Sequence, residues 1–479
     1  MPALRLNREV LGLDRSPQRE GLFCIDFGTA LSKAVASQGR SGYRPLLLPL
    51  GRLAGDPRAA NRYVAQSSLF IDRDRVVHFG HGAVEAWARQ RNYAIARIDS
   101  MKQWLSTGPI ADLDGEFVDE AFLPSNCSLT KGDALTLILA YITDLAGEAL
   151  EKEDLSRHAR RRFTRPVWEA DRARWCDEIM TRYLLRAQLV ADSLSGKWRD
   201  GIVLDDAKEL IERAKGEDVP KWLVEPNGVL EPVAAGHARM EKDYQQRFVA
   251  LVVDVGAGTT DLAVFAGIQA DGSVGITRAV PRGRSVSLSM AGDYLDDVLK
   301  RQILEGFPAS DRSDVVVRQV EGRAREFKEI LFTNGELKTT FVGGLVGPQI
   351  IRSDFVSLGP IREFTQVIGS AAGEVLQSVR GLTDLFAESH EHPLSEISVL
   401  ASGGGAMLPM IRQLAQGRRE IGRHRFVVRD AGPAPGWFTQ NFKDDPKVFY
   451  QMAVAIGGSF PRLPAGAPPA DQIRRGMPL

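Results

Sequence analysis

Two stretches of the chain share one pattern of apolar and polar positions. Residues 22–36 (LFCIDFGTALSKAVA) pass from an apolar run through Asp26 and a Gly-Thr turn into a second apolar run. Residues 248–266 (FVALVVDVGAGTTDLAVFA) repeat this plan around Asp254 and a glycine-rich turn. Each pattern predicts a β-hairpin in which a buried strand enters a tight turn and a second strand leaves it. The interval between the copies indicates duplication on the scale of a domain, because it is too long for a solenoid repeat.

Apolar residues at helical spacing alternate with these strand-like runs. They predict helices over 131–151, 171–194 and 293–305, and a closing helix over 446–458. Residues 397–415 predict a β-branched strand, a three-glycine turn and an amphipathic helix. Because strands and helices mix along the whole chain, the expected fold class is α/β.

The same pattern divides the chain into units. A first lobe with an inserted subdomain is expected over 21–245, a second lobe over 246–446 and a closing helix over 447–460. Residues 195–228 are rich in charge, and we expect them to form a surface insertion in the first lobe. A polar leader is expected at the N-terminus and a Pro-rich tail at the C-terminus, in residues 1–20 and 461–479.

Composition narrows the class of protein. Of the 479 residues, 44% are hydrophobic and 25% are charged, which is typical of a folded, soluble protein. The formal net charge is zero, so neither nucleic acid nor a membrane surface is expected as a partner. Three unclustered cysteines, Cys24, Cys127 and Cys176, indicate a reducing compartment. No signal peptide or membrane-spanning run is predicted, and a cytoplasmic location is expected.

The glycine turns have the composition of phosphate-binding loops. A phosphate requires converging backbone N–H groups and side chains small enough to let the backbone approach. Three loops meet this requirement: Gly28-Thr29-Ala30, Gly256-Ala257-Gly258-Thr259-Thr260 and Gly403-Gly404-Gly405. A carboxylate beside a polyphosphate repels it unless a cation lies between them, so Asp26 and Asp254 predict a Mg²⁺ site. Three such loops suit a large nucleotide held between two lobes.

Three segments together resemble the superfamily of actin, the DnaK-type heat-shock chaperones and the sugar kinases. IDFGTALSK (25–33) is similar to its first phosphate motif, DVGAGTTDLAV (254–264) to its second and SGGGAMLPMI (402–411) to its adenosine motif. The resemblance spans roughly residues 20–460. It implies a two-lobed, actin-like ATPase fold of duplicated ribonuclease-H-like domains, with a central nucleotide cleft. It also implies ATP or ADP and Mg²⁺ as ligands.

The DnaK-type chaperones are the most similar branch. RIDSMKQWLSTG (97–108) resembles the segment that carries their catalytic lysine, which assigns that role to Lys102. VLEPVAAGHA (229–238) resembles their Glu-Pro segment and assigns a carboxylate near the metal to Glu231, with Glu225 as the rival position.

Two further segments support this branch. RFTRPVWEADRAR (162–174) resembles the segment of its proline–arginine relay, here Pro166 and Arg174. EGRAREFKEIL (321–331) resembles its adenosine-contacting helix and places Lys328 at the base-contacting position.

The resemblance assigns roles within one reaction, the transfer of the γ-phosphoryl group to water. Asp26 and Asp254 would hold hydrated Mg²⁺, with Glu231 assisting beside them. Lys102 and Thr259 would position the γ-phosphate and the attacking water. The remaining carboxylate, Asp261, would orient that water or partly deprotonate it.

The sequence also departs from the chaperone pattern. Ala30 stands where a second threonine is usual, and Ala257 interrupts the usual glycine triplet, so nucleotide binding is expected more firmly than a normal rate of hydrolysis. The chaperones continue into a peptide-binding domain, whereas here about twenty Pro-rich residues follow the closing helix. We therefore expect no client-binding domain in this chain.

Three functions fit these features. The leading one is a chaperone-like ATPase that uses nucleotide as a conformational switch for a partner protein, which would be a co-chaperone, a client or a separate client-binding subunit. The second is a filament-forming ATPase of the bacterial actin type, favoured by GTTD (258–261) and AGD (291–293). The third is a small-molecule kinase, although no aspartate that would act as base toward a sugar hydroxyl is identifiable.

Overall fold

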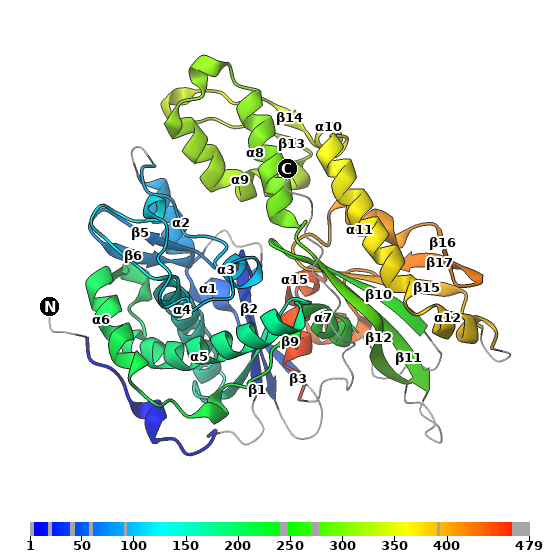
Figure 1. The fold of residues 1–479 in the computed structure, drawn as a ribbon, viewed down its shortest axis with the longest axis horizontal. Coiled ribbons are helices and arrows are strands. Elements are labelled where there is room, and N and C mark those ends of the chain that lie inside the picture. Colours follow the sequence, from blue (N-terminus) through cyan, green and yellow to red (C-terminus); the bar gives the residue numbers. More distant parts are fainter. Residues whose placement is uncertain are drawn as a thin grey trace.

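Two mixed β-sheets form the framework of the protein (Figure 1). The computed structural model describes residues 4–17, 22–38, 44–56, 61–90, 93–239, 248–269, 277–389 and 393–461. The first sheet has the order β3-β2-β1-β7-β9, with β4 also paired to β2. Its strands are β1 (Leu22–Asp26), β2 (Leu31–Gln38), β3 (Arg44–Leu47), β4 (Ala65–Gln66), β7 (Arg160–Arg165) and β9 (Val229–Leu230).

The second sheet has the order β12-β11-β10-β15-β17-β16. Its strands are β10 (Phe248–Val255), β11 (Thr260–Gln269), β12 (Thr277–Leu288), β15 (Glu396–Ser402), β16 (Arg418–Ile421) and β17 (His424–Asp430). The chain is thus an α/β protein with two main mixed sheets, consistent with two lobes.

The two sheets share their strand order and strand directions. In the first sheet, β1 is antiparallel to β2 and parallel to β7, and β7 is parallel to β9. In the second, β10 is antiparallel to β11 and parallel to β15, and β15 is parallel to β17. Strands β3 and β12 add antiparallel partners at the equivalent edges. Both predicted hairpins are confirmed, and each supplies the first two strands of a sheet of the same plan.

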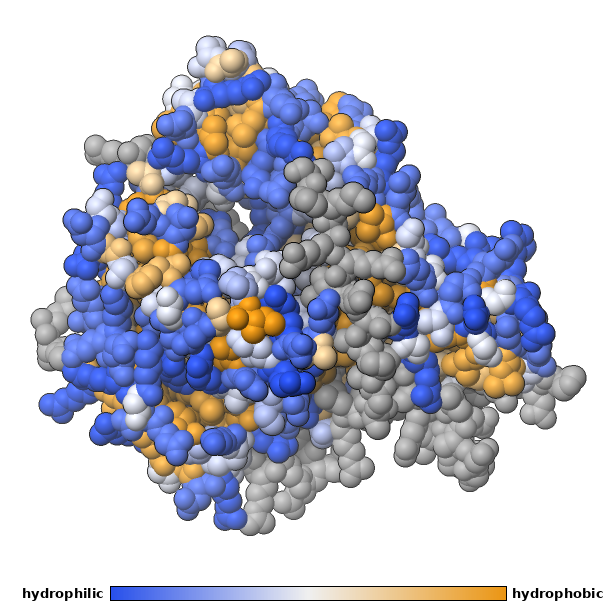
Figure 2. All heavy atoms as spheres, in the orientation of Figure 1, coloured by the Kyte–Doolittle hydropathy of each residue, from blue (hydrophilic) through white to orange (hydrophobic). Residues whose placement is uncertain are grey.

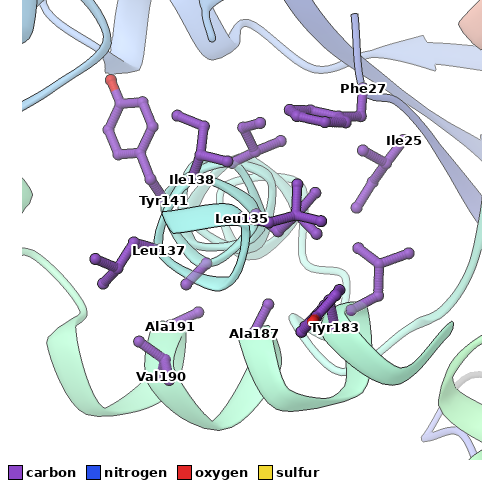
Figure 3. Close-up of a cluster of buried hydrophobic side chains, with 14 of the residues drawn as sticks. Ile25, Phe27, Leu135, Leu137, Ile138, Tyr141, Tyr183, Ala187, Val190 and Ala191 are labelled. Atoms are coloured by element: carbon purple, nitrogen blue, oxygen red, sulfur yellow. The ribbon is translucent and has the colours of Figure 1, made fainter. Parts of the chain in front are cut away.

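Two long helices support the first sheet. Figure 3 shows α4 (Lys131–Glu151) between the end of β1, with Ile25 and Phe27, and α5 (Ala170–Leu194). These side chains belong to one buried cluster. Helix α4 begins where the Thr130 hydroxyl accepts a hydrogen bond from Asp133 N–H, which satisfies a backbone donor of the first turn. Ile25 and Phe27 therefore fix the backbone on both sides of Asp26.

The charged segment 195–228 is integrated into the first lobe. Strand β8 (Ile202–Val203) extends a small sheet of β5 (Leu69–Ile71) and β6 (Val76–Phe79). Helix α6 (Leu204–Lys215) places its apolar face in the lobe core and its charged residues on the other face. Part of the polar leader also packs here, since Val10 is fully buried. The remaining helices of this lobe are α1 (Leu50–Leu53), α2 (Gly80–Ala88) and α3 (Lys102–Ser106).

The second lobe carries its own helices and a buried core of its own. Helices α8 (Gly292–Glu305) and α9 (Asp314–Asn334) stand above the sheet with a short hairpin of β13 (Glu336–Leu337) and β14 (Ile350–Ile351) (Figure 1). The other helices of this lobe are α10 (Arg352–Val356), α11 (Gly359–Gln377), α12 (Arg380–Ala387), α13 (Pro409–Arg412) and α14 (Gly436–Asn441).

Two helices lie between the sheets and join them. Helix α7 (Glu231–Arg239) and helix α15 (Val448–Gly458) share one buried cluster with residues of both sheets. Their crossing is close, because a Cβ atom at Gly457 would lie 1.7 Å from the Ala234 carbonyl oxygen. The chain thus passes from one lobe to the other through a tightly packed helix pair.

The predicted helices agree with α4, α5, α8 and α15 to within two residues at each end. The prediction for 397–415 holds for the strand and the turn, but α13 covers only Pro409–Arg412 and a 3₁₀ turn follows it. The Pro-rich tail beyond residue 461 lies outside the described residues. Among the residues that the structure describes, no helix is both long and apolar enough to cross a bilayer.

Candidate functional site

Asp26 and Asp254 occupy equivalent positions in the two sheets. Alternate residues of a strand point to opposite faces. In β1, Ile25 packs toward α4, so Asp26 faces the other way, as Cys24 does where it lies against α15. In β10, Val253 lies in the core of the second lobe and Val252 in the cluster between the sheets, so Asp254 faces the first lobe. Both aspartates therefore lie on the faces that the two sheets turn toward each other.

The first two glycine turns contact one another. Gly28 requires the absence of a side chain, because a Cβ atom there would lie 2.1 Å from the Leu31 carbonyl oxygen. A Cβ atom at Gly258 would lie 2.9 Å from Thr29 Oγ1. The second turn also bonds to the start of α8, since Gly292 N–H donates to Gly256 O at 3.1 Å. The fold thus brings together the two turns that the sequence singled out.

A hydroxyl group holds each aspartate from the neighbouring parallel strand. Thr164 Oγ1 donates to Asp26 Oδ1 at 2.9 Å, and Ser402 Oγ donates to Asp254 Oδ1 at 2.6 Å. The strand register explains the match, because Asp254 pairs with Ser402 across β10 and β15 and Asp26 takes the same place beside Thr164. Sequence reasoning missed both hydroxyls, and only the parallel pairing of distant strands reveals them.

The antiparallel partner differs between the two halves. Asp26 pairs with Lys33 across the first hairpin, and Lys33 Nζ lies 2.8 Å from Asp26 Oδ2. In the second hairpin the equivalent partner of Asp254 is Asp261. Lys33 was not among the predicted site residues. The sequence does contain a signal for it, because in a hairpin with a four-residue turn the residue seven positions after Asp26 pairs with that aspartate. Asp26 is therefore neutralised locally, whereas Asp254 faces a second carboxylate.

Lys102 and Glu231 form a buried ion pair. Lys102 begins α3 and Glu231 begins α7, and their charged groups are in contact. The rival carboxylate, Glu225, instead pairs with Arg160 and Arg162. The structure thus brings Glu231, not Glu225, next to Lys102.

Asp261 is fully buried beside this pair. Its Oδ1 accepts a hydrogen bond from Val167 N–H at 3.0 Å. Its Oδ2 has no hydrogen-bond partner among the described residues, although the Thr259 and Ser287 hydroxyls are near enough to lower its pKa. Burial outweighs them and raises the pKa of Asp261 overall. An acceptor that is buried without a partner destabilises the protein, and an additional donor or a cation bound beside it would remove this cost.

The site holds more buried acidic groups than basic ones. Asp26, Glu231, Asp254 and Asp261 are all buried, and the cations next to them are Lys33 and Lys102. Burial raises the pKa of Glu231 to about 8, against the opposing charge of Lys102. Burial, with help from Asp261 and Asp26, raises the pKa of Asp254 to about 6.

Asp26 behaves differently from these carboxyls. Burial acts to raise its pKa, but the charges of Lys33 and Lys102 outweigh burial and lower it. The raised pKa values of Glu231, Asp254 and Asp261 indicate that these buried carboxyls lack compensating positive charge, which a divalent cation would supply. No three His, Cys, Asp or Glu side chains of the described residues are grouped closely enough to hold a metal ion by themselves, so Mg²⁺ bound here would keep several waters. Asp254 is the better direct ligand, because both oxygens of Asp26 already have protein partners.

The third glycine cluster packs on the second turn. Gly405 N–H donates to Val255 O at 3.0 Å, and Gly403 has φ 81° where a Cβ atom would strike the same carbonyl group. A Cβ atom at Gly404 would meet open space. Lys328, predicted to contact a nucleobase, donates to Gly292 O at 2.7 Å and pairs with Asp296. All three loops and Lys328 therefore border one region.

Two predicted residues are otherwise engaged. The Thr260 hydroxyl donates to Met290 O at 2.7 Å and serves the turn itself. Arg174, the proposed relay arginine, has a side chain that is 73% exposed and lies near Asp171, while Pro166 is buried. Among the described residues, no hydrogen bond or ion pair joins Arg174 to the buried carboxylates, whereas Pro166 precedes Val167, whose N–H donates to Asp261.

Figure 2 shows an opening between the first lobe and the part of the second lobe formed by α8 and α9, with hydrophilic residues along much of its rim.

The comparisons with known proteins do not identify a family for this chain. No protein-family model matches the chain, and no curated protein is significantly similar to it.

Proposed function

We propose that this protein is an ATPase of the actin, DnaK-type chaperone and sugar-kinase superfamily, with two ribonuclease-H-like lobes that close on Mg·ATP. One observation carries the proposal. Two sheets with the same order over five strands each carry an aspartate at or next to the end of a central strand, with a glycine turn after it, and the two turns touch at Thr29 and Gly258. A turn with only a structural role does not require an equivalent glycine turn in contact with it from the other lobe.

The glycine loops supply backbone N–H groups for the phosphates, and Lys328 lies where a nucleoside would extend. Asp254 would hold Mg²⁺, which neutralises phosphate charge when bound. Asp26, which is ion-paired with Lys33, would assist it. Lys102 and Thr259 position the γ-phosphate and water. Asp261 is held by Val167 N–H with one oxygen unpartnered, which suits it to accept a proton from that water.

Calorimetric titration tests the binding step. Wild-type protein with Mg²⁺ should bind ATP and ADP, chelation of the metal should weaken binding, and Asp254→Asn should do the same. Asp297→Asn is a matched control, because this exposed residue of α8 pairs only with nearby Lys300 in the described residues. Absence of binding by the wild type at millimolar ATP would reject the proposal.

Lobe closure gives the nucleotide a means to act on a partner protein. The lobes are joined by α7 and α15, and Glu231 of the site is the first residue of α7. We propose that occupancy of the site changes how the lobes sit about this helix pair, and so changes affinity for a client, co-chaperone or client-binding subunit. A pull-down with ATP-bound wild type and with Asp261→Ala tests this, and identical partners in both would reject the switch.

Filament formation is the second candidate. It is favoured by exposed apolar side chains on the segment that forms β13 and β14, namely Val342, Val346 and Ile351. Sedimentation with ATP over a range of salt and protein concentrations separates the two. Nucleotide-dependent pelleting that Val346→Asp abolishes would support self-assembly over a partner switch.

A further inference from the structure

Asp293, in the first turn of α8, bonds to both lobes. Its backbone N–H donates to Ala257 O of the second glycine turn at 2.7 Å. Its Oδ2 accepts from Gln103 Nε2 of the first lobe at 2.7 Å and from Ser100 Oγ at 3.4 Å. We call Ser100, Gln103 and Asp293 the cross-lobe clasp.

The clasp flanks Lys102 in sequence. Ser100 has φ 58°, a left-handed conformation that residues other than glycine seldom adopt. Gln103 N–H donates to Ser100 O at 2.8 Å, so both residues belong to the turn that opens α3. Such a strained backbone persists only when its surroundings hold it. Lys102 therefore reaches Glu231 from a turn whose side chains are held by the opposite lobe.

The clasp is built so that it can open. Arg325 of α9 lies 3.8 Å from Asp293 Oδ1 within the second lobe, so Asp293 keeps a charged neighbour when the lobes separate. Ser100 and Gln103 would exchange one hydrogen bond each for water, which shifts the opening equilibrium by about tenfold for each bond. These two bonds therefore stabilise the closed arrangement modestly and can break when the lobes separate.

We propose that Asp293 is a positioning residue that couples closure of the lobes to the placement of Lys102. It acts through Gln103 and Ser100 on the turn that carries the lysine. The consequence for ATP hydrolysis rests on the proposed function, whereas the coupling itself is a property of the protein alone.

Hydrogen exchange of the full-length, nucleotide-free protein tests the coupling. Asp293→Ala and Gln103→Ala should each speed exchange of amides 100–106 by about tenfold, the loss expected for one hydrogen bond. The double variant should be no faster than Asp293→Ala alone, because that variant already removes the contact with Gln103. Asp293→Asn keeps an acceptor oxygen and should restore protection, and Asp297→Ala should change nothing. Unchanged or additive exchange in correctly folded variants would overturn the proposal.

Kinetics provide a readout that a merely structural role would not produce. Asp293→Ala and Gln103→Ala should lower the kcat of ATP hydrolysis by about tenfold, with the Kd for nucleotide changed less than about twofold. A loss of affinity without a loss of kcat would overturn the assignment. If the wild type binds no nucleotide, the proposed function fails, and the exchange experiment still decides the clasp.

Discussion

At the scale of single residues, the charge of Lys33 makes two otherwise equivalent aspartates different. Asp26 and Asp254 have equivalent strand positions, and each accepts from a hydroxyl group on the neighbouring parallel strand. Across the hairpin, however, Asp26 has a lysine and Asp254 has Asp261. Their pKa values move in opposite directions as a result. Asp26 is thus ionised and paired with Lys33, whereas Asp254 faces a second carboxyl and holds its proton up to about pH 6.

Asp254→Asn is expected to stabilise the nucleotide-free protein at neutral pH. The pKa of Asp254 is about 6 in the folded protein, above the ordinary 3.8, so the folded state holds the proton more tightly. That contribution falls as the pH rises from about 4 to about 6, because the unfolded state loses its proton first. Asparagine avoids ionisation and should raise the free energy of unfolding at pH 7 by about 1–3 kcal/mol.

Urea denaturation across this pH range measures the effect. The difference between Asp254→Asn and wild type should grow between about pH 4 and pH 6 and then level off. Asp297→Asn should follow the wild type throughout. A constant difference over the whole range would mean that Asp254 does not hold its proton in the folded protein.

Ser402→Ala is expected to raise the Mg²⁺ concentration that nucleotide binding requires by more than Thr164→Val does. Asp26 keeps its ion pair with Lys33 after the Thr164 hydroxyl is lost, whereas Asp254 loses the donor at its Oδ1. A hydrogen bond to a charged group contributes about 1.5–3 kcal/mol, so Ser402→Ala should raise the Mg²⁺ concentration at half-saturation by about tenfold or more. Equal shifts in both variants would show that Lys33 does not compensate for Thr164.

At the scale of elements, the sequence predicts structure formed by consecutive residues but not the contacts between strands that lie far apart in the chain. The hairpins around Asp26 and Asp254 are predicted because strand, turn and strand are consecutive and glycine marks the turn. Thr164 and Ser402 are not predicted, because β7 and β15 reach their aspartates only through parallel pairing over a long interval. The charge of 195–228 suggests a surface insertion, whereas the apolar face of α6 is part of the lobe core.

The crossing of α7 and α15 permits a direct test of element packing. Gly457→Ala would place a Cβ atom 1.7 Å from the Ala234 carbonyl oxygen, and backbone cannot move aside as a flexible side chain does. Overpacking of this kind costs about 1–3 kcal/mol or more. Gly373→Ala is the matched control, because a Cβ atom there meets nothing within 4 Å in α11 and should stabilise by about 0.5–1 kcal/mol. Equal melting temperatures for the two variants would contradict the close crossing.

At the scale of the whole molecule, the lobes also meet away from the glycine turns, the clasp and the helix pair α7–α15. Trp87 of α2 packs against Gly322 of α9, where a Cβ atom would lie 2.1 Å from the indole ring. The Tyr93 hydroxyl accepts from Gln319 Nε2 at 2.9 Å, and Arg97 donates to Gly322 O at 3.2 Å. This outer contact and the helix pair α7–α15 join the two lobes at separate places in the fold (Figure 1).

Gly322→Val is therefore expected to favour an open arrangement of the lobes. The added side chain would clash with the Trp87 ring, which packs on Tyr93, and the clash is relieved when α9 moves away from the first lobe. Small-angle scattering should show a larger radius of gyration, and bound nucleotide should dissociate about tenfold faster, since the outer contact no longer delays opening. Glu321→Ala, an exposed neighbour on the same helix, controls for changes in α9 itself. Faster release should accompany weaker protection of amides 100–106, because the clasp at Asp293 closes only when the lobes do. Release at the wild-type rate from a protein that scattering finds expanded would show that the outer contact does not govern access to the site.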